Sequence, residues 1–189
     1  MKILFTLASL AMVASASISL PSNFKTNFKQ TITNNKDRVI IYDGTVKFKN
    51  ENQIIINEQG DSHQIKSSMF RWDYKNPTKK EVCTDGIQVV VVDHDLEQIS
   101  RYIVDEGINL EEILKVAEQI STTDYKATYK EIEYLITLDE KSWLKKIFYV
   151  DNLDNRVKIE FEQMNYDNNS FDSSSLECIA PSDYDIIEG

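Results

Sequence analysis

The chain has 189 residues, 41% of them hydrophobic, and its 31 acidic and 21 basic side chains give a formal net charge of −10. This acidity argues against binding to nucleic acid or to anionic membrane surfaces, because both attract Lys and Arg. Glycine and proline are scarce, at five and three residues, and the length suits one folded domain.

The N-terminus has the pattern of a secretory signal peptide. Lys2 precedes an apolar stretch, residues 3–14, and Ala14-Ser15-Ala16 supplies small residues for cleavage. The stretch is shorter than the roughly 20 residues that a membrane-spanning helix needs. A buried N-terminal helix is the alternative interpretation. We therefore expect a cleaved signal peptide, residues 1–16, followed by a single exported domain, residues 17–189.

Strands are predicted to dominate the rest of the chain. Residues 23–33 suit a short amphipathic helix, or a helix passing into a strand, because Phe24 and Phe28 would share a helical face. Asp85-Gly86 predicts a hairpin with a type I′ turn. Many adjacent strands with short turns indicate an antiparallel sheet that curls or closes. The strand-forming runs are residues 39–49, 53–57, 65–74, 81–84, 87–92, 125–129, 132–138, 143–150 and 156–164.

One helix is predicted, from Leu110 to Ile120. Asn109 and, three residues later, Glu112 resemble a capping box. Such a helix would pack on one face or one mouth of the sheet. The apolar residues at helical spacing are Leu110, Ile113, Leu114, Ala117 and Ile120.

Residues that could support catalysis or bind a metal are few. Asp93-His94-Asp95 contains three possible ligands, but alternation along a strand would turn His94 away from both carboxylates. The sequence has no Gly-rich phosphate loop and no recognisable Ser or Cys nucleophile motif. We therefore expect neither an enzyme nor a bound metal or cofactor.

Two cysteines, Cys83 and Cys178, occur in a chain that we expect to be exported. An oxidising compartment permits a disulfide between them. Two separate buried thiols are equally compatible with the sequence. Cys83 is far from the predicted cleavage site, so we expect the mature protein to carry no lipid on an N-terminal cysteine.

One strand carries a run of large aromatic residues. Phe70, Trp72 and Tyr74 alternate onto one side of it, and Val89 and Val91 share a side of a later strand. Such residues suit either an ordinary core or the lining of a cavity for a lipid chain.

Several short motifs occur together in one order. With the signal peptide, they resemble the outer-membrane lipoprotein carrier family, LolA, of the periplasmic Lol system. The resemblance runs, with gaps, from about Phe24 to Ile187. The motifs are Phe28-Lys29-Gln30, Gly44 with Val46 and Phe48, Phe70-Arg71-Trp72-Asp73-Tyr74, Pro77, Asp85-Gly86, Asp95-Leu96-Glu97-Gln98 and Pro181-Ser182-Asp183-Tyr184-Asp185-Ile186-Ile187.

The resemblance implies a mainly β (α+β) fold, an unclosed antiparallel β-barrel or strongly curved sheet with a helical lid. It implies a monomeric periplasmic carrier without cofactor. Such a carrier takes the acyl chains of lipoproteins from an inner-membrane ABC-type release complex to the outer membrane, where an acceptor receives them if one is present. A periplasmic binding protein for a free lipid or other small apolar ligand is the alternative. The residues implied are Phe48, Phe70, Trp72, Tyr74, Val89 and Val91 for the cavity, and Leu110, Ile113, Leu114 and Ala117 for the lid.

The chain departs from the family pattern at the lid latch. The family has a basic residue and a proline six and five positions before the tryptophan, where this sequence has Lys66 and Ser67. Gly44 and Trp72 also stand further apart than in the family, as if a hairpin around residues 50–64 were inserted. Lys66 is therefore our expected latch residue, with Lys49 as the alternative.

Overall fold

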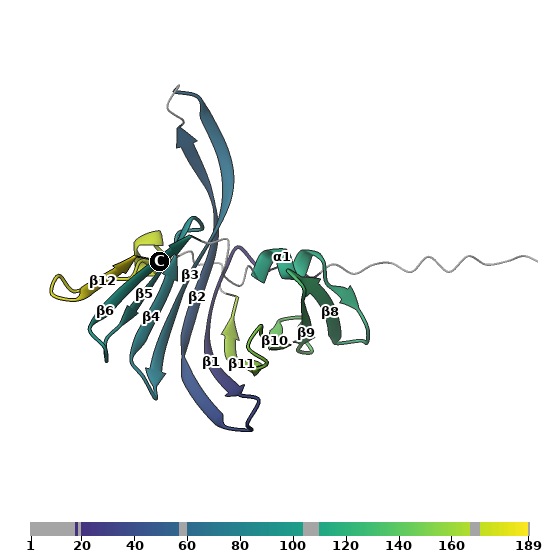
Figure 1. Ribbon diagram of the computed structural model, residues 1–189. Helices are drawn as coiled ribbons and strands as arrows, with labels where there is room; N and C mark the ends of the chain where they lie inside the picture. Colours follow the sequence, from purple (N-terminus) through teal and green to yellow (C-terminus); the bar gives the residue numbers. More distant parts are fainter. Residues whose placement is uncertain (1–17, 19, 57–59, 104–109, 167–170, 189) are drawn as a thin grey trace, which may run out of the picture.

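The computed structural model describes residues 18, 20–56, 60–103, 110–166 and 171–188. In this part of the chain, twelve strands form one sheet, in the order β12-β6-β5-β4-β3-β2-β1-β11-β10-β9-β8-β7. The sheet curves strongly without closing, so that β12 and β7 are left as its two edges (Figure 1). The expected open, curved sheet with few helices is confirmed.

The described helices are α1 (Leu110–Lys115) and the 3₁₀ helix η2 (Ser173–Leu176). The strands are β1 (Asn23–Thr33), β2 (Val39–Ile56), β3 (Ser62–Asn76), β4 (Lys80–Thr84), β5 (Gln88–Asp93), β6 (Gln98–Ile103), β7 (Glu118–Gln119), β8 (Asp124–Tyr129), β9 (Ile132–Leu138), β10 (Leu144–Val150), β11 (Arg156–Asn165) and β12 (Asp185–Glu188).

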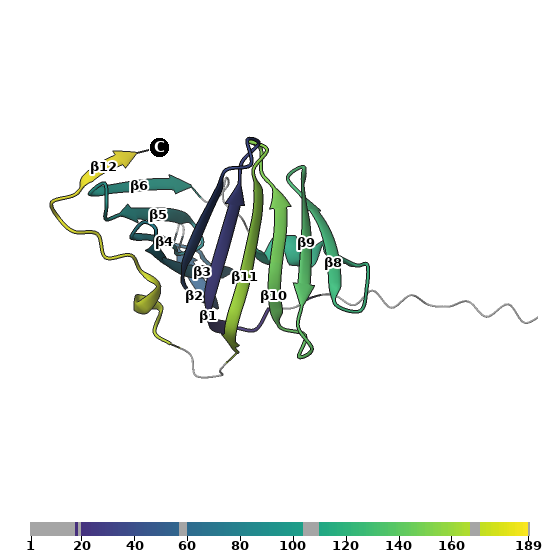
Figure 2. The same ribbon diagram turned by 90° about the horizontal axis from the view of Figure 1, so that it is seen from below.

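Two antiparallel meanders make up the sheet. One runs from β1 to β6 and the other from β7 to β11, and β1 joins them by pairing with β11 as well as β2. Figure 2 shows β1 and β11 side by side between the two halves. The sheet is not purely antiparallel, because β12 pairs with β6 in parallel.

The helix expected at residues 23–33 is wrong, since this segment is strand β1. A spacing of four places Phe24 and Phe28 on one face of a helix, but it also places them on one face of a strand. Both side chains are buried, and so is Thr26 between them. The period is therefore two, and neighbours on both sides supply the backbone partners that a strand requires.

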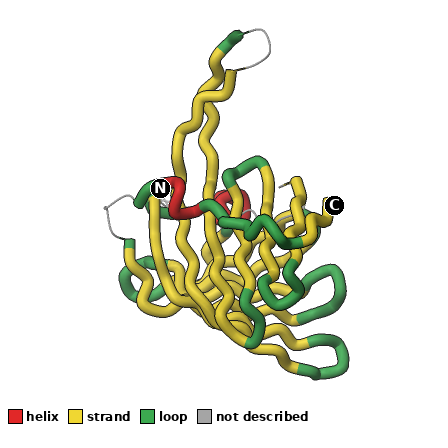
Figure 3. Tube along the Cα trace, turned by 90° about the vertical axis from the view of Figure 1, so that its left-hand side faces the viewer, coloured by secondary structure: helices red, strands yellow, loops and turns green. Residues whose placement is uncertain are grey.

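The expected inserted hairpin is present as an extension of β2 and β3. Beyond Lys49 the two strands continue to pair from Asn50 and Ser68 out to Ile56 and Ser62. This arm projects well past the other strands (Figures 1 and 3). The two runs expected at 39–49 and 53–57 are thus parts of one strand, β2, and residue 57, the last of the second run, lies outside the described residues.

The turn at Asp85-Gly86 is not type I′. Of the two, only Gly86 has a positive φ, 93°. Asp85 instead stabilises a longer loop, because its carboxylate accepts hydrogen bonds from the backbone N–H groups of Ile87 and Gln88, both at 2.8 Å. Gly86 also lies against Ser67, and a Cβ there would stand 2.0 Å from the serine Oγ.

Helix α1 is shorter than expected. It ends at Lys115, and the chain then turns into the short strand β7, which pairs with β8. Ile113 and Leu114 are buried whereas Ile120 is 58% exposed, so the apolar face does not continue to Ile120. Asn109 of the predicted capping box lies outside the described residues.

The main hydrophobic core lies on the concave face of the sheet. It joins β1 and β2 with β8–β11 and includes residues of α1. The opposite, outer face carries a smaller group of buried side chains, Met69, Cys83, Val92 and Ile99, together with Leu176 of η2. Within the described residues, no helix is long and apolar enough to cross a membrane.

Candidate functional site

A cavity of about 380 Å³ lies on the concave face, between the two halves of the sheet. Strands β1–β5 line it from one half, β10 and β11 line it from the other, and α1 contributes to one end. Its volume falls in the lower range of small-molecule sites, about 300–1,000 Å³. Apolar and aromatic side chains predominate among the residues that line it, which suits an apolar ligand.

The aromatic strand β3 forms one wall of this cavity. Phe70, Trp72 and Tyr74 all line it, as their two-residue spacing predicts. Phe48 of β2 and Val89 of β5 line it too. The remaining candidate, Val91, is on β5 opposite Val82 and does not line the cavity. From the facing half come Ile147 and Tyr149 of β10, and Ile159 and Phe161 of β11.

Trp72 connects the two walls through aromatic contacts. Its ring lies edge-on to Phe28 at 4.7 Å between centroids and 6.1 Å from Phe161. Phe28 also meets Tyr74 edge-on at 5.0 Å. Edge-to-face pairs of this kind stabilise by about 0.5–1.5 kcal/mol beyond the area that they bury. The position of Trp72 is therefore fixed by packing, with one side left facing the cavity.

The end of the cavity away from α1 contains neutral polar groups. The Tyr74 hydroxyl donates to Gln30 Oε1 at 3.2 Å. Burial, with the nearby Tyr42, raises the pKa of Tyr74 to about 12, and burial also raises the pKa of Tyr149. Both phenols therefore stay uncharged at neutral pH, so this end offers hydrogen bonds without a charge.

Of the expected lid residues, Leu110 and Ile113 line the cavity. Leu114 and Ala117 instead pack in the main core. α1 is tied to the β2–β3 arm by a contact that the sequence did not predict. Glu111 Oε2 accepts a hydrogen bond from Ser68 Oγ at 2.7 Å.

The structure does not bring Lys49 to the lid. Its Nζ donates to Ser173 Oγ of η2 at 2.8 Å and lies 3.3 Å from Glu51 Oε1. Phe48 faces the cavity, so the next residue points to the outer face, and Lys49 is therefore wrong as a lid latch. The backbone of Lys66 pairs with Asn52, but its side chain lies outside what the structure describes, so its role stays a prediction.

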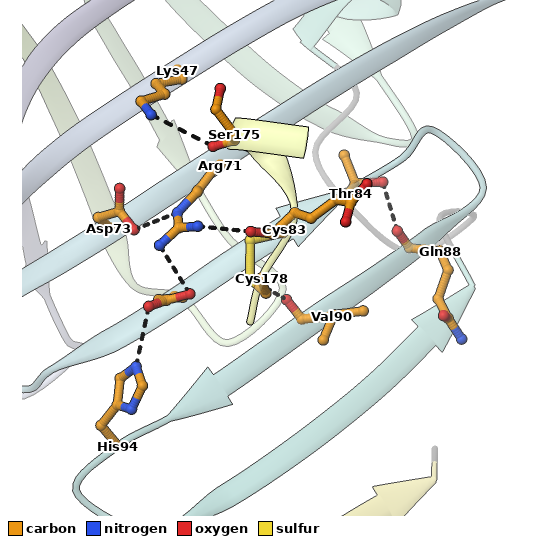
Figure 4. Close-up of a disulfide and its surroundings, with 12 residues drawn as sticks. Lys47, Arg71, Asp73, Cys83, Thr84, Gln88, Val90, His94, Ser175 and Cys178 are labelled. Carbon is orange, nitrogen blue, oxygen red and sulfur yellow. Dashed lines mark hydrogen bonds and ion pairs between the residues drawn. A yellow bond between two sulfur atoms is a disulfide. The ribbon is translucent and has the colours of Figure 1, made fainter. Parts of the chain in front are cut away.

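On the outer face, Cys83 of β4 and Cys178 are joined in a disulfide, with 5.7 Å between their Cα atoms. Of the two alternatives for this pair, the structure therefore has the disulfide and not two separate buried thiols. Figure 4 shows Arg71 close to the bond, where it donates to the carbonyl of Glu177 at 2.7 Å. The disulfide therefore holds a C-terminal strap, residues 171–188, over the side of the sheet opposite the cavity.

A metal site is not supported at the one cluster of candidate ligands found among the described residues. Glu81, Cys83 and Cys178 lie close together, but the two sulfur atoms are bonded to each other. Glu81 is already paired with Arg71 at 3.1 Å and with His94 at 3.2 Å. His94 also lies 3.1 Å from the Tyr184 hydroxyl, so it serves to hold the strap.

Residues 45–133 match the family model of the outer membrane lipoprotein carrier protein LolA. A protein of Campylobacter jejuni named outer-membrane lipoprotein carrier protein is 41% identical over 63 residues, 33% of this chain and 37% of that protein. A protein of the same name from Helicobacter hepaticus is 31% identical over 90 residues, 44% and 50% of the two chains. The matches thus span half or less of these relatives.

Two solved structures with low sequence identity align with most of this chain. An uncharacterised conserved protein of Thermus thermophilus has a TM-score of 0.49 at 12% identity, over 90% of this chain and 92% of its own. A LolA superfamily protein of Nitrosomonas europaea has a TM-score of 0.46 at 11% identity, over 85% and 93%. The fold of this chain is defined by its own strand pairing. The matched segment, which includes strand β3 and helix α1, and the two named relatives make this chain similar to the LolA family of outer-membrane lipoprotein carriers.

Proposed function

We propose that this protein is a periplasmic carrier that holds the acyl chains of lipoproteins in its concave cavity. It would receive them from an inner-membrane ABC-type release complex and deliver them to the outer membrane. The signal peptide expected at residues 1–16, which lie outside the described part of the chain, would direct its export.

The observation that most directly supports this proposal is the apolar cavity lined by Phe70, Trp72 and Tyr74, within the segment that matches the family. Removing a methylene group from water stabilises by about 0.8 kcal/mol, so an exposed acyl chain crosses an aqueous compartment poorly. An aromatic wall supplies large apolar contact without demanding one ligand geometry. Carriage of this kind needs no chemical step on the cargo, so we propose a binding protein and not an enzyme.

Trp72→Glu tests the proposal. A carboxylate in an apolar site costs several kcal/mol unless it is protonated or hydrated. Next to a cavity the new carboxylate can reach water, so we expect the domain to fold while lipoprotein binding falls at least tenfold. Circular dichroism would report the fold, and pull-down of acylated lipoprotein would report binding.

The second tryptophan provides a matched control. Trp143 packs on Tyr166 at 4.8 Å between ring centroids and does not line the cavity. Trp143→Glu makes the same chemical change and should leave lipoprotein binding near the wild-type level. A folded Trp72→Glu protein that still binds lipoprotein normally would contradict the proposed site. If small free lipids but no acylated proteins copurify with the native carrier, the alternative of a free-lipid binding protein is favoured.

A further inference from the structure

The end of the cavity away from α1 presents hydrogen-bond donors that no described residue accepts. Tyr149 lines the cavity and is only 8% exposed, and within the described part of the chain its hydroxyl has no hydrogen-bond partner. Gln30 accepts from the Tyr74 hydroxyl through Oε1 at 3.2 Å. Its amide NH₂ group, which has no partner among the described residues, keeps two protons to donate. Buried donors without a partner are costly, so an occupant of this end should carry an acceptor.

Strand pairing brings these groups together on the concave face. Gln30 of β1 stands opposite Ile159 of β11, and Ile159 stands opposite Ile147 of β10. Tyr149 follows Ile147 by two residues, so it lies on the same face of β10. Burial raises the pKa of Tyr149, and the nearby phenol of Tyr74 adds to this effect. The two phenols and the amide therefore form one neutral polar group at this end of the cavity.

This end of the cavity lies close to solvent. Tyr42 of β2 stands opposite Gln30, and its ring lies edge-on to Tyr74 at 5.7 Å between centroids. Ile40, two residues before Tyr42 on the same face, is 47% exposed. The polar part of a ligand can therefore leave the cavity here, while its hydrocarbon runs along Trp72 towards α1.

We propose that Gln30 and Tyr149 form a subsite for the carbonyl oxygen of an ester-linked acyl chain. This inference rests on the proposed function. An ester carbonyl is uncharged and only accepts hydrogen bonds, which matches an amide N–H and a phenol O–H. Apolar walls discriminate weakly between similar hydrocarbon chains, whereas a site with hydrogen-bond donors disfavours an analogue that lacks the acceptor. The subsite would therefore favour an acyl chain over an alkyl chain of the same length.

The test compares ester-linked with ether-linked chains, because an ether lacks the carbonyl oxygen and keeps the chain length and the charge. One pair of probes is a diacylglyceryl-cysteine lipopeptide and its dialkyl analogue. The other pair is monomyristoylglycerol and the matching alkyl ether of glycerol. Binding is measured below the micelle concentration by competition with a fluorescent fatty-acid probe. One hydrogen bond between neutral groups contributes about two- to tenfold in affinity, so the wild-type protein should favour the ester at least about fivefold.

Variants of the two donors test the assignment. Tyr149→Phe removes one donor and breaks no described hydrogen bond, so it should fold normally and reduce the ester preference by at least half. Gln30→Leu is made in a Tyr74→Phe background, so that no hydroxyl loses its acceptor, and the preference should fall relative to Tyr74→Phe alone. Tyr125→Phe is the matched control, because Tyr125 of β8 is 6% exposed but does not line the cavity. It should keep the wild-type preference.

The two pairs of probes separate this inference from the proposed function. Equal affinity for ester and ether in both pairs, or an unchanged preference in the Tyr149 and Gln30 variants, overturns the subsite alone. A preference for the ester-linked lipopeptide supports the subsite and assigns its carbonyl to lipoproteins. A preference confined to the glycerol lipids supports the subsite and contradicts the proposed cargo. Wild-type protein that binds none of these probes overturns the proposed cavity function and this inference with it.

Discussion

Removing the disulfide should cost this domain several kcal/mol without disturbing the cavity. Cys83 and Cys178 are 95 residues apart in the sequence, so the bond closes a long loop in the unfolded chain. The chain-entropy model gives about 4.7 kcal/mol for a loop of about 100 residues, as an upper figure. Measured losses are commonly about 2–4 kcal/mol, a large share of the 5–15 kcal/mol typical of a folded domain.

The perturbation is Cys83→Ala together with Cys178→Ala, measured by urea unfolding beside the oxidised and the reduced wild type. The strap keeps other contacts, including Lys49 with Ser173 and Arg71 with the carbonyl of Glu177, so the variant should still fold. Reductant should lower the wild-type free energy of unfolding by about 2–4 kcal/mol and leave the variant unchanged. A difference under 1 kcal/mol between oxidised and reduced wild type would refute the reasoning.

Two further predictions concern the sheet and the cavity. Gly44→Ala should lower the free energy of unfolding by more than about 2 kcal/mol, because the new Cβ would stand 2.0 Å from the Asp73 carbonyl oxygen and 2.8 Å from the Phe28 ring. Chemical denaturation measures this change, and an unchanged free energy of unfolding would contradict the close approach. Tyr74 has a pKa raised to about 12, so from pH 10 to about 12 it ionises in the unfolded chain first and stability falls as pH rises. Tyr74→Phe should reduce this loss by about 2 kcal/mol when unfolding is compared at pH 9 and 11.5, and equal losses in both proteins would contradict the assignment.

The sequence predicted well those features that a two-residue period encodes. The strand β3 carries its aromatics at alternate positions, and these three side chains do line the cavity. The same pattern could have identified Ser68, which precedes Phe70 on the same face. The helix predicted from the spacing of Phe24 and Phe28 was wrong, because residues four apart lie on one face of a helix and also on one face of a strand. Only the pairing of β1 with β2 and β11 decides between them.

The features that the sequence did not predict depend on partners distant in the chain. Lys49 was a latch candidate because of its position between Gly44 and Trp72. Its partner in the structure is Ser173 of η2, and nothing in the local sequence predicts that η2 contacts β2. The parallel strand β12 is likewise short and has exposed apolar residues, Ile186 and Ile187, so its place beside β6 is set by the strap and not by its own pattern. The hydrogen bond from Ser68 to Glu111 depends on the position of α1 beside the arm, which the local sequence does not predict.

The pairing of β1 with β11 has a consequence for how this chain would fold on the proposed route of export. The first strand to leave a translocation channel finds β2 soon afterwards, but its other neighbour is near the opposite end of the polypeptide. Until β11 has emerged, Phe28 lacks the neighbouring strand that carries Phe161, and the cavity lacks its second wall. Contacts so distant in sequence form slowly. On the proposed route of export, the apolar cavity is therefore completed only after nearly the whole protein has crossed the membrane, and a half-translocated chain would not yet take up lipid.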